Sequence, residues 1–222
     1  MRLEGKTAII TGAGGDLGRG TALRLAEEGA RVLVNDIRLE SAEETVALVE
    51  KAGGQAIANA ADITDAEAVG AMVDQALGAW GQVDILVNNA GDIRDSLIAK
   101  MSEEAWDWVL DLNLKGSFLC TRAVAPHMIE RTSGRIVNLS SLAYKGNIGQ
   151  ANYVAAKSGI VGLTQASGLE FARYGISVNC VAPGLIDTPK AETLDDATRE
   201  RLVRMTPMRR MGEIVDIANT IL

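Results

Sequence analysis

The chain has 222 residues, 47% of them hydrophobic and 23% charged, which is the size and composition of a globular protein with a sizeable core and excludes a disordered chain. The formal net charge of -7 at pH 7 argues against nucleic acid or an anionic membrane as a partner. No apolar run reaches membrane-spanning length and the first residues show no signal-like segment, so we expect one cytoplasmic domain over residues 1–222.

Short β-rich segments alternate with longer helical segments, which is typical of βαβ units and a parallel sheet. Strands are predicted at Thr7–Thr11, Arg31–Asn35, Gln55–Ala58, Asp84–Val87, Arg135–Leu139 and Ile176–Val181. Helices are predicted at Leu17–Glu28, Ser41–Ala52, Ala66–Leu77, Ser102–Arg131 with a break, Ala151–Arg173 and Ile214–Leu222. Gly29, Gly53 and Gly175 stand where helices are expected to end.

A glycine-rich turn joins the first strand to the first helix, with the sequence Thr11-Gly12-Ala13-Gly14-Gly15-Asp16-Leu17-Gly18. Glycines let the backbone turn tightly and approach a pyrophosphate, whose charge is met by the N-terminus of the helix. A turn in this position predicts a dinucleotide site in a Rossmann-type, doubly wound parallel sheet. The alternative is a turn with a purely structural role.

Asp36 ends the second strand, eighteen residues after Gly18. A carboxylate there accepts hydrogen bonds from the adenosine ribose and repels the extra phosphate of NADP. Because Arg38 partly cancels that repulsion, we expect NAD(P)H as the cofactor, with a modest preference for NAD(H). The alternative is an ordinary turn aspartate.

Polar residues end two further strands at the same edge of the expected sheet. Asn88-Asn89-Ala90-Gly91 closes the fourth strand, and Ser140 and Ser141 close the fifth. Asn113 lies in an otherwise apolar helical pattern, and a buried amide there bridges backbone groups or serves the site. After the sixth strand, residues 185–211 are expected to be an irregular substrate lid or, alternatively, a surface excursion.

Tyr153 and Lys157 are four residues apart on a predicted helix and therefore share a face. An adjacent ammonium favours a phenolate, so we expect Lys157 to lower the pKa of Tyr153 and the pair to serve as a general acid and base. Taken alone, this spacing is more often an amphipathic surface pair.

The two cysteines, Cys120 and Cys180, are isolated in apolar surroundings and have no metal-ligand spacing to one another or to His127. We expect two buried thiols, no metal site, and a histidine near the end of a helix.

Together these residues resemble the short-chain dehydrogenase/reductase family, and the resemblance covers the whole chain. The segment 146–153, with the sequence Gly-Asn-Ile-Gly-Gln-Ala-Asn-Tyr, is most similar to 3-oxoacyl-acyl-carrier-protein reductases. The shared motifs are Thr11-Gly12-x-x-x-x-x-Gly18, Asn88-Asn89-Ala90-Gly91, Asn113, Ser141, Tyr153-x-x-x-Lys157 and Pro183-Gly184.

The resemblance implies hydride transfer from reduced nicotinamide to a ketone, which gives a secondary alcohol. It implies that Tyr153 protonates the carbonyl oxygen, that Lys157 holds the nicotinamide ribose, and that Asn113 holds a water linking Lys157 to solvent. The implied catalytic residues are Asn113, Ser141, Tyr153 and Lys157. The implied cofactor-binding residues are Gly12, Gly14, Asp16, Leu17, Gly18, Asp36, Asp62 (at the adenine), Ile63, Asn89, Ala90, Gly91, Tyr153, Lys157, Pro183, Gly184, and Ile186 with Thr188 (at the carboxamide).

Asp16 departs from the family pattern, since it replaces the usual middle glycine. Aspartate tolerates a positive φ, so the turn is expected to survive. A like charge about 4 Å from a phosphate costs up to about 4 kcal/mol at an effective dielectric of about 20 and nearer 1 in water. We expect a weakened but working cofactor site.

The serine and the chain end are two further departures. Counting along the fifth strand selects Ser141, whereas counting back from Tyr153 selects Ser140. A shortened loop is easier to accommodate than a strand slip, which favours Ser141. Family members usually continue with another strand that adds to the sheet and to a subunit interface. Because Leu222 ends this sequence in mid-helix, we expect a fragment or a shortened chain without that strand.

Three functions are compatible with these features. The first is a reductase of 3-oxoacyl thioesters that docks an acyl carrier protein through Arg131 and Arg173. The second is an NAD-dependent dehydrogenase of another secondary alcohol. The third is a non-catalytic nucleotide sensor on the same fold. The resemblance implies a dimer or tetramer for the enzyme.

Overall fold

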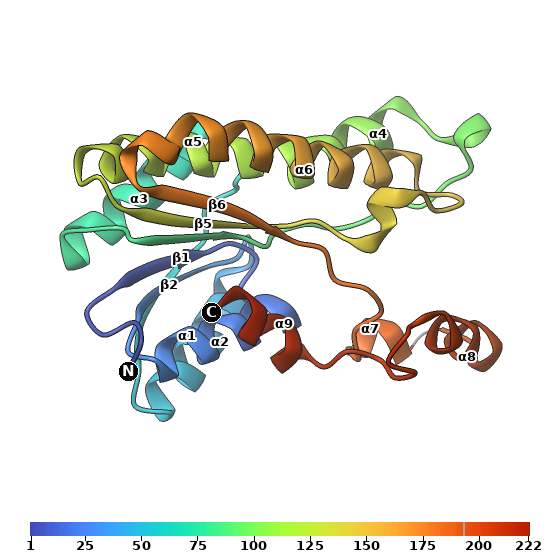
Figure 1. Cartoon of the computed structure of the whole chain (residues 1–222), viewed down its shortest axis with the longest axis horizontal. Coiled ribbons are helices and arrows are strands. Elements are labelled where there is room, and N and C mark those ends of the chain that lie inside the picture. The colour runs from blue at the N-terminus through green and yellow to red at the C-terminus, as the bar shows by residue number, and fades with distance from the viewer. Residues whose placement is uncertain (193) are drawn as a thin grey trace.

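The computed structural model describes residues 1–192 and 194–222, and its strands form one six-stranded parallel sheet (Figure 1). The strand order β3-β2-β1-β4-β5-β6 is the doubly wound Rossmann arrangement, so the predicted fold class is confirmed. The strands are β1 (Thr7–Ile10), β2 (Arg31–Asn35), β3 (Gln55–Asn59), β4 (Ile85–Asn88), β5 (Gly134–Leu139) and β6 (Ile176–Val181).

Helices cover both faces of the sheet (Figure 1). They are α1 (Asp16–Glu27), α2 (Leu39–Lys51), α3 (Ala66–Trp80), α4 (Glu103–Leu110), α5 (Gly116–Glu130), α6 (Ala151–Phe171), α7 (Pro189–Glu192), α8 (Asp196–Met205) and α9 (Ile214–Ile221). Side chains alternate between the two cores: Ala8 and Ile10 of β1 pack towards α1, α2 and α9, whereas Ile9 packs towards α3 and α5. Burial on both faces explains why the strands are continuously apolar.

The predicted elements are found with boundaries shifted by a few residues at most. Gly29, Gly53 and Gly175 follow helices with φ of 91°, 86° and 69°, a conformation that favours glycine. His127 lies in the last turn of α5, as predicted. Within the described residues, no helix is both long and apolar enough to cross a membrane, and no group of three or more His, Cys, Asp or Glu is arranged to hold a metal ion.

The helix predicted over Ser102–Arg131 contains no break. Instead a π-helical turn, Asp111–Lys115, joins α4 to α5. The side-chain amide of Asn113 donates to Val109 O at 2.9 Å, and that carbonyl is the one which the Asn113 N–H uses in a regular α-helix. The competing side chain therefore accounts for the wider turn.

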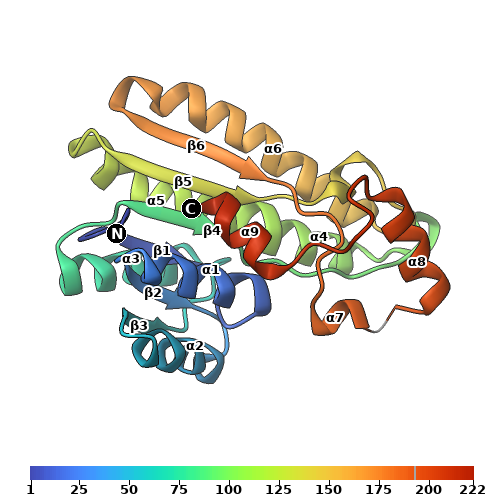
Figure 2. The same cartoon turned by 60° about the horizontal axis from the view of Figure 1, so that its bottom comes forward.

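The prediction of an irregular stretch over 185–211 is wrong, because this segment contains α7 and α8. Asp195 caps α8 by accepting a hydrogen bond from Thr198 N at 2.9 Å. A parallel bridge between Ile186 and Gly212 closes the base of the segment. Figure 2 shows both helices beyond the carboxyl ends of the strands, on the side of the sheet edge where ligands bind in such folds.

A buried carboxylate, Asp84, ties together the amino ends of the strands. It accepts hydrogen bonds from Thr7 N at 2.9 Å and from the Arg131 guanidinium at 2.9 Å, and it lies 3.5 Å from Lys6 Nζ. Burial raises the pKa of Asp84, but these hydrogen bonds and cations outweigh it and hold the pKa below its ordinary value.

We expect Asp84→Asn to lower the free energy of unfolding by about 2 kcal/mol at pH 7, measured by urea denaturation. Because the folded-state pKa is below the unfolded value, the ionised carboxylate stabilises the fold at neutral pH, and this contribution is lost as the pH falls below about 4. The difference in the free energy of unfolding between the wild type and Asp84→Asn should therefore become smaller below about pH 4. The exposed Asp74→Asn is the control; an equal loss in both variants contradicts the role of Asp84.

Candidate active site

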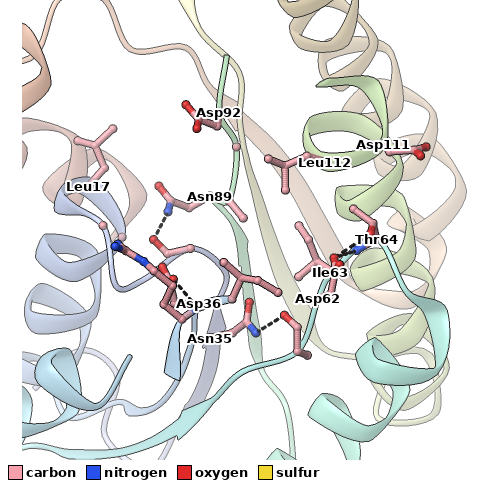
Figure 3. Close-up of a pocket in the computed structure, with 18 of the residues that line it drawn as sticks. Leu17, Asn35, Asp36, Asp62, Ile63, Thr64, Asn89, Asp92, Asp111 and Leu112 are labelled. Atoms are coloured by element: carbon pink, nitrogen blue, oxygen red, sulfur yellow. Dashed lines mark hydrogen bonds between the residues drawn. The ribbon is translucent and has the colours of Figure 1, made fainter. Parts of the chain in front are cut away.

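A cleft of about 840 Å³ opens where β1 to β4 end, at the point where the strand order reverses. Figure 3 shows residues from the ends of different strands gathered around it: Asn35 at the end of β2 with Asp36 after it, Asp62 to Thr64 after β3, and Asn89 and Asp92 after β4. This volume and position are those of a typical cofactor site in an open α/β sheet.

The glycine-rich turn forms one wall of the cleft. Gly12 has φ of 62°, and a Cβ there would lie 2.7 Å from Ala90 Cα, so only glycine fits. Asn89 fixes the turn by donating through Nδ2 to Thr11 O at 2.9 Å and to Gly12 O at 3.1 Å. A Cβ on Gly18 would lie 2.6 Å from the same amide nitrogen.

The first turn of α1 has no side-chain cap, in contrast to α3, α4 and α8, which begin with capping residues. Asp16, Leu17 and Gly18 of this turn line the cleft. An uncapped helix N-terminus presents free N–H groups and a partial positive charge to an anion. It is therefore suited to a pyrophosphate.

Asp16 lies in this uncapped turn and is exposed. It begins α1 with a negative φ, since Thr132 and Arg209 are the described non-glycine residues with positive φ. The tolerance of aspartate for positive φ is therefore not needed here. Arg19 donates to Gly14 O at 3.0 Å and pairs with Glu44 at 3.0 Å, so its guanidinium is held by these groups and not by Asp16.

Asp36 faces the glycine-rich turn. Its Oδ2 accepts a hydrogen bond from Gly14 N at 3.2 Å, and a Cβ on Gly14 would lie 2.7 Å from that oxygen. Glycine at position 14 thus allows the carboxylate to approach. Asp36 and Arg38 both line the cleft, which brings the two predicted determinants of cofactor choice together.

Asp62 and Ile63 line the opposite wall of the cleft. Asp62 Oδ1 accepts hydrogen bonds from Thr64 N and Thr64 Oγ1, both at 2.8 Å, which orient the carboxylate. Gly116 allows α5 to approach this wall, because a Cβ there would lie 2.6 Å from Ile63 Cδ1.

Tyr153, Lys157 and Ser141 lie together beside the cleft. Lys157 Nζ is 5.4 Å from the centre of the Tyr153 ring and donates to Leu139 O at 2.9 Å. The Ser141 hydroxyl is close enough to the phenol to lower the pKa of Tyr153. A Cβ on Gly91, which lines the cleft, would lie 3.2 Å from Lys157 Nζ, so the cluster adjoins the cleft at this glycine.

Burial dominates the protonation of both groups. It raises the pKa of Tyr153 despite Ser141, with a further increase from Asp92 and Asp95. It lowers the pKa of Lys157 to about 8. The predicted lowering of the phenol pKa by Lys157 is therefore not observed; the ammonium is itself desolvated and bonded to Leu139 O.

Asn113 is fully buried against the same cluster. Its amide nitrogen donates to Asp92 O and Val109 O, both at 2.9 Å. Its Oδ1 accepts no hydrogen bond within the described part of the chain and lies where a Cβ on Gly91 would be. A buried acceptor of this kind is suited to a water molecule or another polar ligand.

The two serines that end β5 have different surroundings. Ser140 is buried and donates to Lys157 O at 2.8 Å, which holds α6 against the strand. Ser141 is the one that faces Tyr153. Cys120 is buried as predicted, but Cys180 is only half-buried and lies near the hydroxyls of Thr164 and Ser140 and the charge of Lys157, so the prediction of apolar surroundings was wrong for it.

Most of the predicted cofactor residues line the cleft. Those that do not are Gly14, Tyr153, Lys157, Pro183, Gly184 and Ile186. Pro183 O accepts a hydrogen bond from Leu142 N at 2.9 Å and so lies beside Ser141, whereas Ile186 is partly buried and packs against the core. Thr188 does line the cleft.

Sequence reasoning missed several lining residues. Several of them lie at or directly after the end of a strand or beside one of the motifs, and this position could have indicated them. Trp108, Asp111 and Leu112 are three and four residues apart and so share one face of a helix, and this spacing could have indicated them as well. The missed residues are Gly15, Asn35, Ile37, Ala61, Thr64, Asp92, Trp108, Asp111 and Leu112.

Known proteins share this arrangement. The family model described as short chain dehydrogenase matches residues 6–199. The chain belongs to the short-chain dehydrogenase family. Members of this family are oxidoreductases that act on CH–OH groups and use NAD(P)(H), so the predicted enzyme class is confirmed.

Relatives of this short-chain dehydrogenase have different substrates. It is 46% identical over 222 residues to the (2S)-[(R)-hydroxy(phenyl)methyl]succinyl-CoA dehydrogenase subunit BbsD of Thauera aromatica, covering 100% of this chain and 90% of that protein. It is 44% identical over 218 residues to the 3-oxoacyl-[acyl-carrier-protein] reductase FabG of Staphylococcus aureus, covering 97% and 89%. The crystal structure of NAD+-bound xylitol dehydrogenase matches with a TM-score of 0.94 and 33% identity, covering 100% and 92%.

Removing the charge of Asp16 is expected to strengthen cofactor binding. Since the carboxylate is solvated, Asp16→Asn should lower the Kd for NADH about three- to fivefold at low ionic strength, measured by fluorescence titration. The gain in affinity for NADH should become smaller as the salt concentration rises, because salt screens the charge of Asp16. Asp74→Asn, which is exposed and does not line the cleft, is the control. An unchanged or weaker affinity in Asp16→Asn contradicts the proposed repulsion.

Proposed function

We propose that this enzyme uses NAD(P)H to reduce a ketone to a secondary alcohol, and that the ketone is a 3-oxoacyl thioester. The observation that carries the proposal is the position of Tyr153, Ser141 and Lys157 beside Gly91, where the cluster meets the cleft. A proton donor, a hydroxyl partner and a cation are the groups that stabilise developing charge on a carbonyl oxygen.

The cleft fits a dinucleotide, because it has a volume of about 840 Å³ and the uncapped N-terminus of α1 opens onto it. The glycine-rich turn would hold the pyrophosphate, Asp36 a ribose, and Asp62 with Ile63 the adenine. Lys157 would hold the second ribose, with Ile186 and Thr188 at the carboxamide. A bound reduced nicotinamide supplies the hydride.

Tyr153 is proposed to donate its proton to the carbonyl oxygen. Because burial raises its pKa, the phenol keeps its proton at neutral pH and is ready to donate. Ser141 hydrogen-bonds the same oxygen and orients it. The Lys157 ammonium, 5.4 Å from the centre of the phenol ring, is proposed to hold the nicotinamide ribose beside Tyr153 rather than to lower the pKa of the phenol.

Lys157 and Asn113 are proposed to return a proton to Tyr153. A lysine with a pKa of about 8 exchanges protons readily near neutral pH. The free acceptor Oδ1 of Asn113 holds a water between this lysine and solvent.

The choice of substrate rests on similarity, since the chain is 44% identical to an acyl-carrier-protein reductase and 46% identical to an enzyme that acts on an acyl-CoA. Both names indicate thioesters. Docking of a carrier through Arg131 is not favoured, because Arg131 is paired with buried Asp84 at the amino ends of the strands. We further propose a cytoplasmic homo-oligomer.

The position of Asp36 favours a second candidate function, an NAD-dependent dehydrogenase of another secondary alcohol. Its carboxylate lines the cleft where it would meet the adenosine ribose, and the similar xylitol dehydrogenase is NAD+-bound. The same residues would then run the reaction in reverse, with Tyr153 as the base.

Replacing Tyr153 with phenylalanine tests the mechanism. We expect Tyr153→Phe to reduce the turnover of an acetoacetyl thioester at least about a hundredfold, because the proton donor is lost. The Kd for NADH, measured by titration, should change less than about twofold. Tyr144→Phe, in the 3-10 helical turn Leu142–Lys145, is the matched control. Full turnover in Tyr153→Phe would exclude the proposed role.

The pH dependence of reduction should report Lys157. With a pKa of about 8, lysine is charged below pH 8 and loses its charge above it. We therefore expect kcat/KM for reduction to be level from pH 6 to about 7.5 and to fall about tenfold per pH unit well above 8. Circular dichroism across the range excludes unfolding. A profile that stays level to about pH 9.5 is the contradicting result.

A further inference from the structure

Arg94 lies over an aromatic ring that lines the cleft. Its guanidinium carbon is 3.9 Å from the centre of the Trp108 ring, and Trp108 lines the cleft with Asp92, Asp111 and Leu112. The side chain is exposed and, within residues 1–192 and 194–222, takes part in no hydrogen bond or ion pair. Its five N–H donors are therefore available to a ligand.

The backbone of Arg94 is fixed next to Tyr153. The buried Asn152 donates through Nδ2 to Arg94 O at 3.0 Å and to Ala105 O at 3.1 Å, and its Oδ1 accepts from Tyr153 N at 2.8 Å. One amide thus connects the loop after β4, helix α4 and the helix that carries the phenol.

A second set of contacts holds the same loop. Gln150 Nε2 donates to both oxygens of Asp95 at 3.1 Å, and Ser96 N donates to Gly149 O at 2.8 Å. The loop also lies within electrostatic range of the phenol, because Asp92 and Asp95, on either side of Arg94, both raise the pKa of Tyr153. A ligand with its carbonyl at Tyr153 can therefore extend towards Arg94.

Arg94 is a cation beside a cleft whose ionisable lining residues are mostly acidic. The cleft is lined by five aspartates, Asp16, Asp36, Asp62, Asp92 and Asp111, and by one arginine, Arg38, so acidic side chains outnumber basic ones in its lining. A guanidinium stacked on an indole keeps its N–H edge free for bidentate binding of a carboxylate or phosphate, and stacking holds it in place before the ligand arrives.

We propose that Arg94, held on Trp108, is an anion-binding subsite that recognises an oxyanion on the ketone substrate. The inference rests on the proposed function and narrows its substrate class to anionic ketones. The oxyanion has two sources, a carboxylate on the acyl group or a phosphate on the carrier arm of the thioester.

Three 3-oxoacyl thioesters distinguish a carboxylate on the acyl group from a phosphate on the carrier arm. The N-acetylcysteamine thioester of acetoacetate carries no anion, acetoacetyl-CoA carries phosphates, and the N-acetylcysteamine thioester of 3-oxoadipate carries a carboxylate. Each is assayed with the wild type, Arg94→Gln, Arg94→Lys and the control Arg122→Gln. Arg122 is also an exposed arginine over an aromatic ring, 5.4 Å from the centre of Phe118.

The quantity measured is the kcat/KM for an anionic thioester divided by that for the neutral one. We expect this ratio to fall about tenfold or more in Arg94→Gln, through KM, for at least one anionic substrate, and to recover partly in Arg94→Lys. The affected substrate identifies the source. An unchanged ratio in Arg94→Gln, or an equal fall in Arg122→Gln, overturns the proposal.

A binding measurement tests the Arg94 subsite separately from the proposed reductase function. In the Tyr153→Phe background, the Kd of each thioester is measured by titration with and without Arg94→Gln. We expect the anionic thioester to bind about tenfold more weakly without the guanidinium. Equal affinities overturn the subsite. Lack of turnover of all three substrates by the wild type refutes the proposed function, while this titration still decides the role of Arg94.

Discussion

The burial of one ammonium group, Lys157 Nζ, is the constraint on which the site depends. A desolvated cation is costly unless polar groups surround it, and the pKa near 8 reflects that cost. Leu139 O at the end of β5 accepts one of its hydrogen bonds. Gly91 has no side chain that would displace the Lys157 ammonium. The free Oδ1 of Asn113 lies against the same glycine. The end of a strand, a loop and a π-helical turn therefore converge on one cation.

The parallel sheet explains why these groups meet beside a cofactor cleft. Strand ends with the same direction share an edge, so residues far apart in the chain, such as Asp36 and Asn89, face one space. Polar contacts beneath that edge fix the relative positions of the strands and helices. Asn88 donates to Asn138 Oδ1 at 2.8 Å, and Asn138 donates to Thr164 Oγ1 of α6 at 2.9 Å. A buried, bonded network of this kind specifies one arrangement of the elements that carry Ser141 and Lys157.

The sequence was sufficient for features that depend on local pattern. Period and glycine placement predicted the six strands and the helix ends, and the strand-end position of Asp36 placed it in the cleft. Features that depend on tertiary packing were not predictable. The upward shift of the Tyr153 pKa comes from burial, the π-helical turn comes from the competing amide of Asn113, and the stacking of Arg94 on Trp108 joins two segments with no shared motif. Helices α7 and α8 were missed because α7 is only four residues long and α8 carries no buried residue, so neither has a clear apolar stripe.

The decisive measurement is the initial rate of reduced-nicotinamide consumption with an acetoacetyl thioester, run in parallel with NADH and NADPH. We expect consumption that requires both the thioester and the cofactor, and that is faster with NADH because the Asp36 carboxylate lines the cleft and would repel the extra phosphate of NADPH. Faster consumption with NADPH would mean that Arg38 has a stronger effect on the choice of cofactor than Asp36. It would still support the reduction of the thioester. Absence of consumption with either cofactor, in a protein that binds both, would contradict the proposed reduction of 3-oxoacyl thioesters.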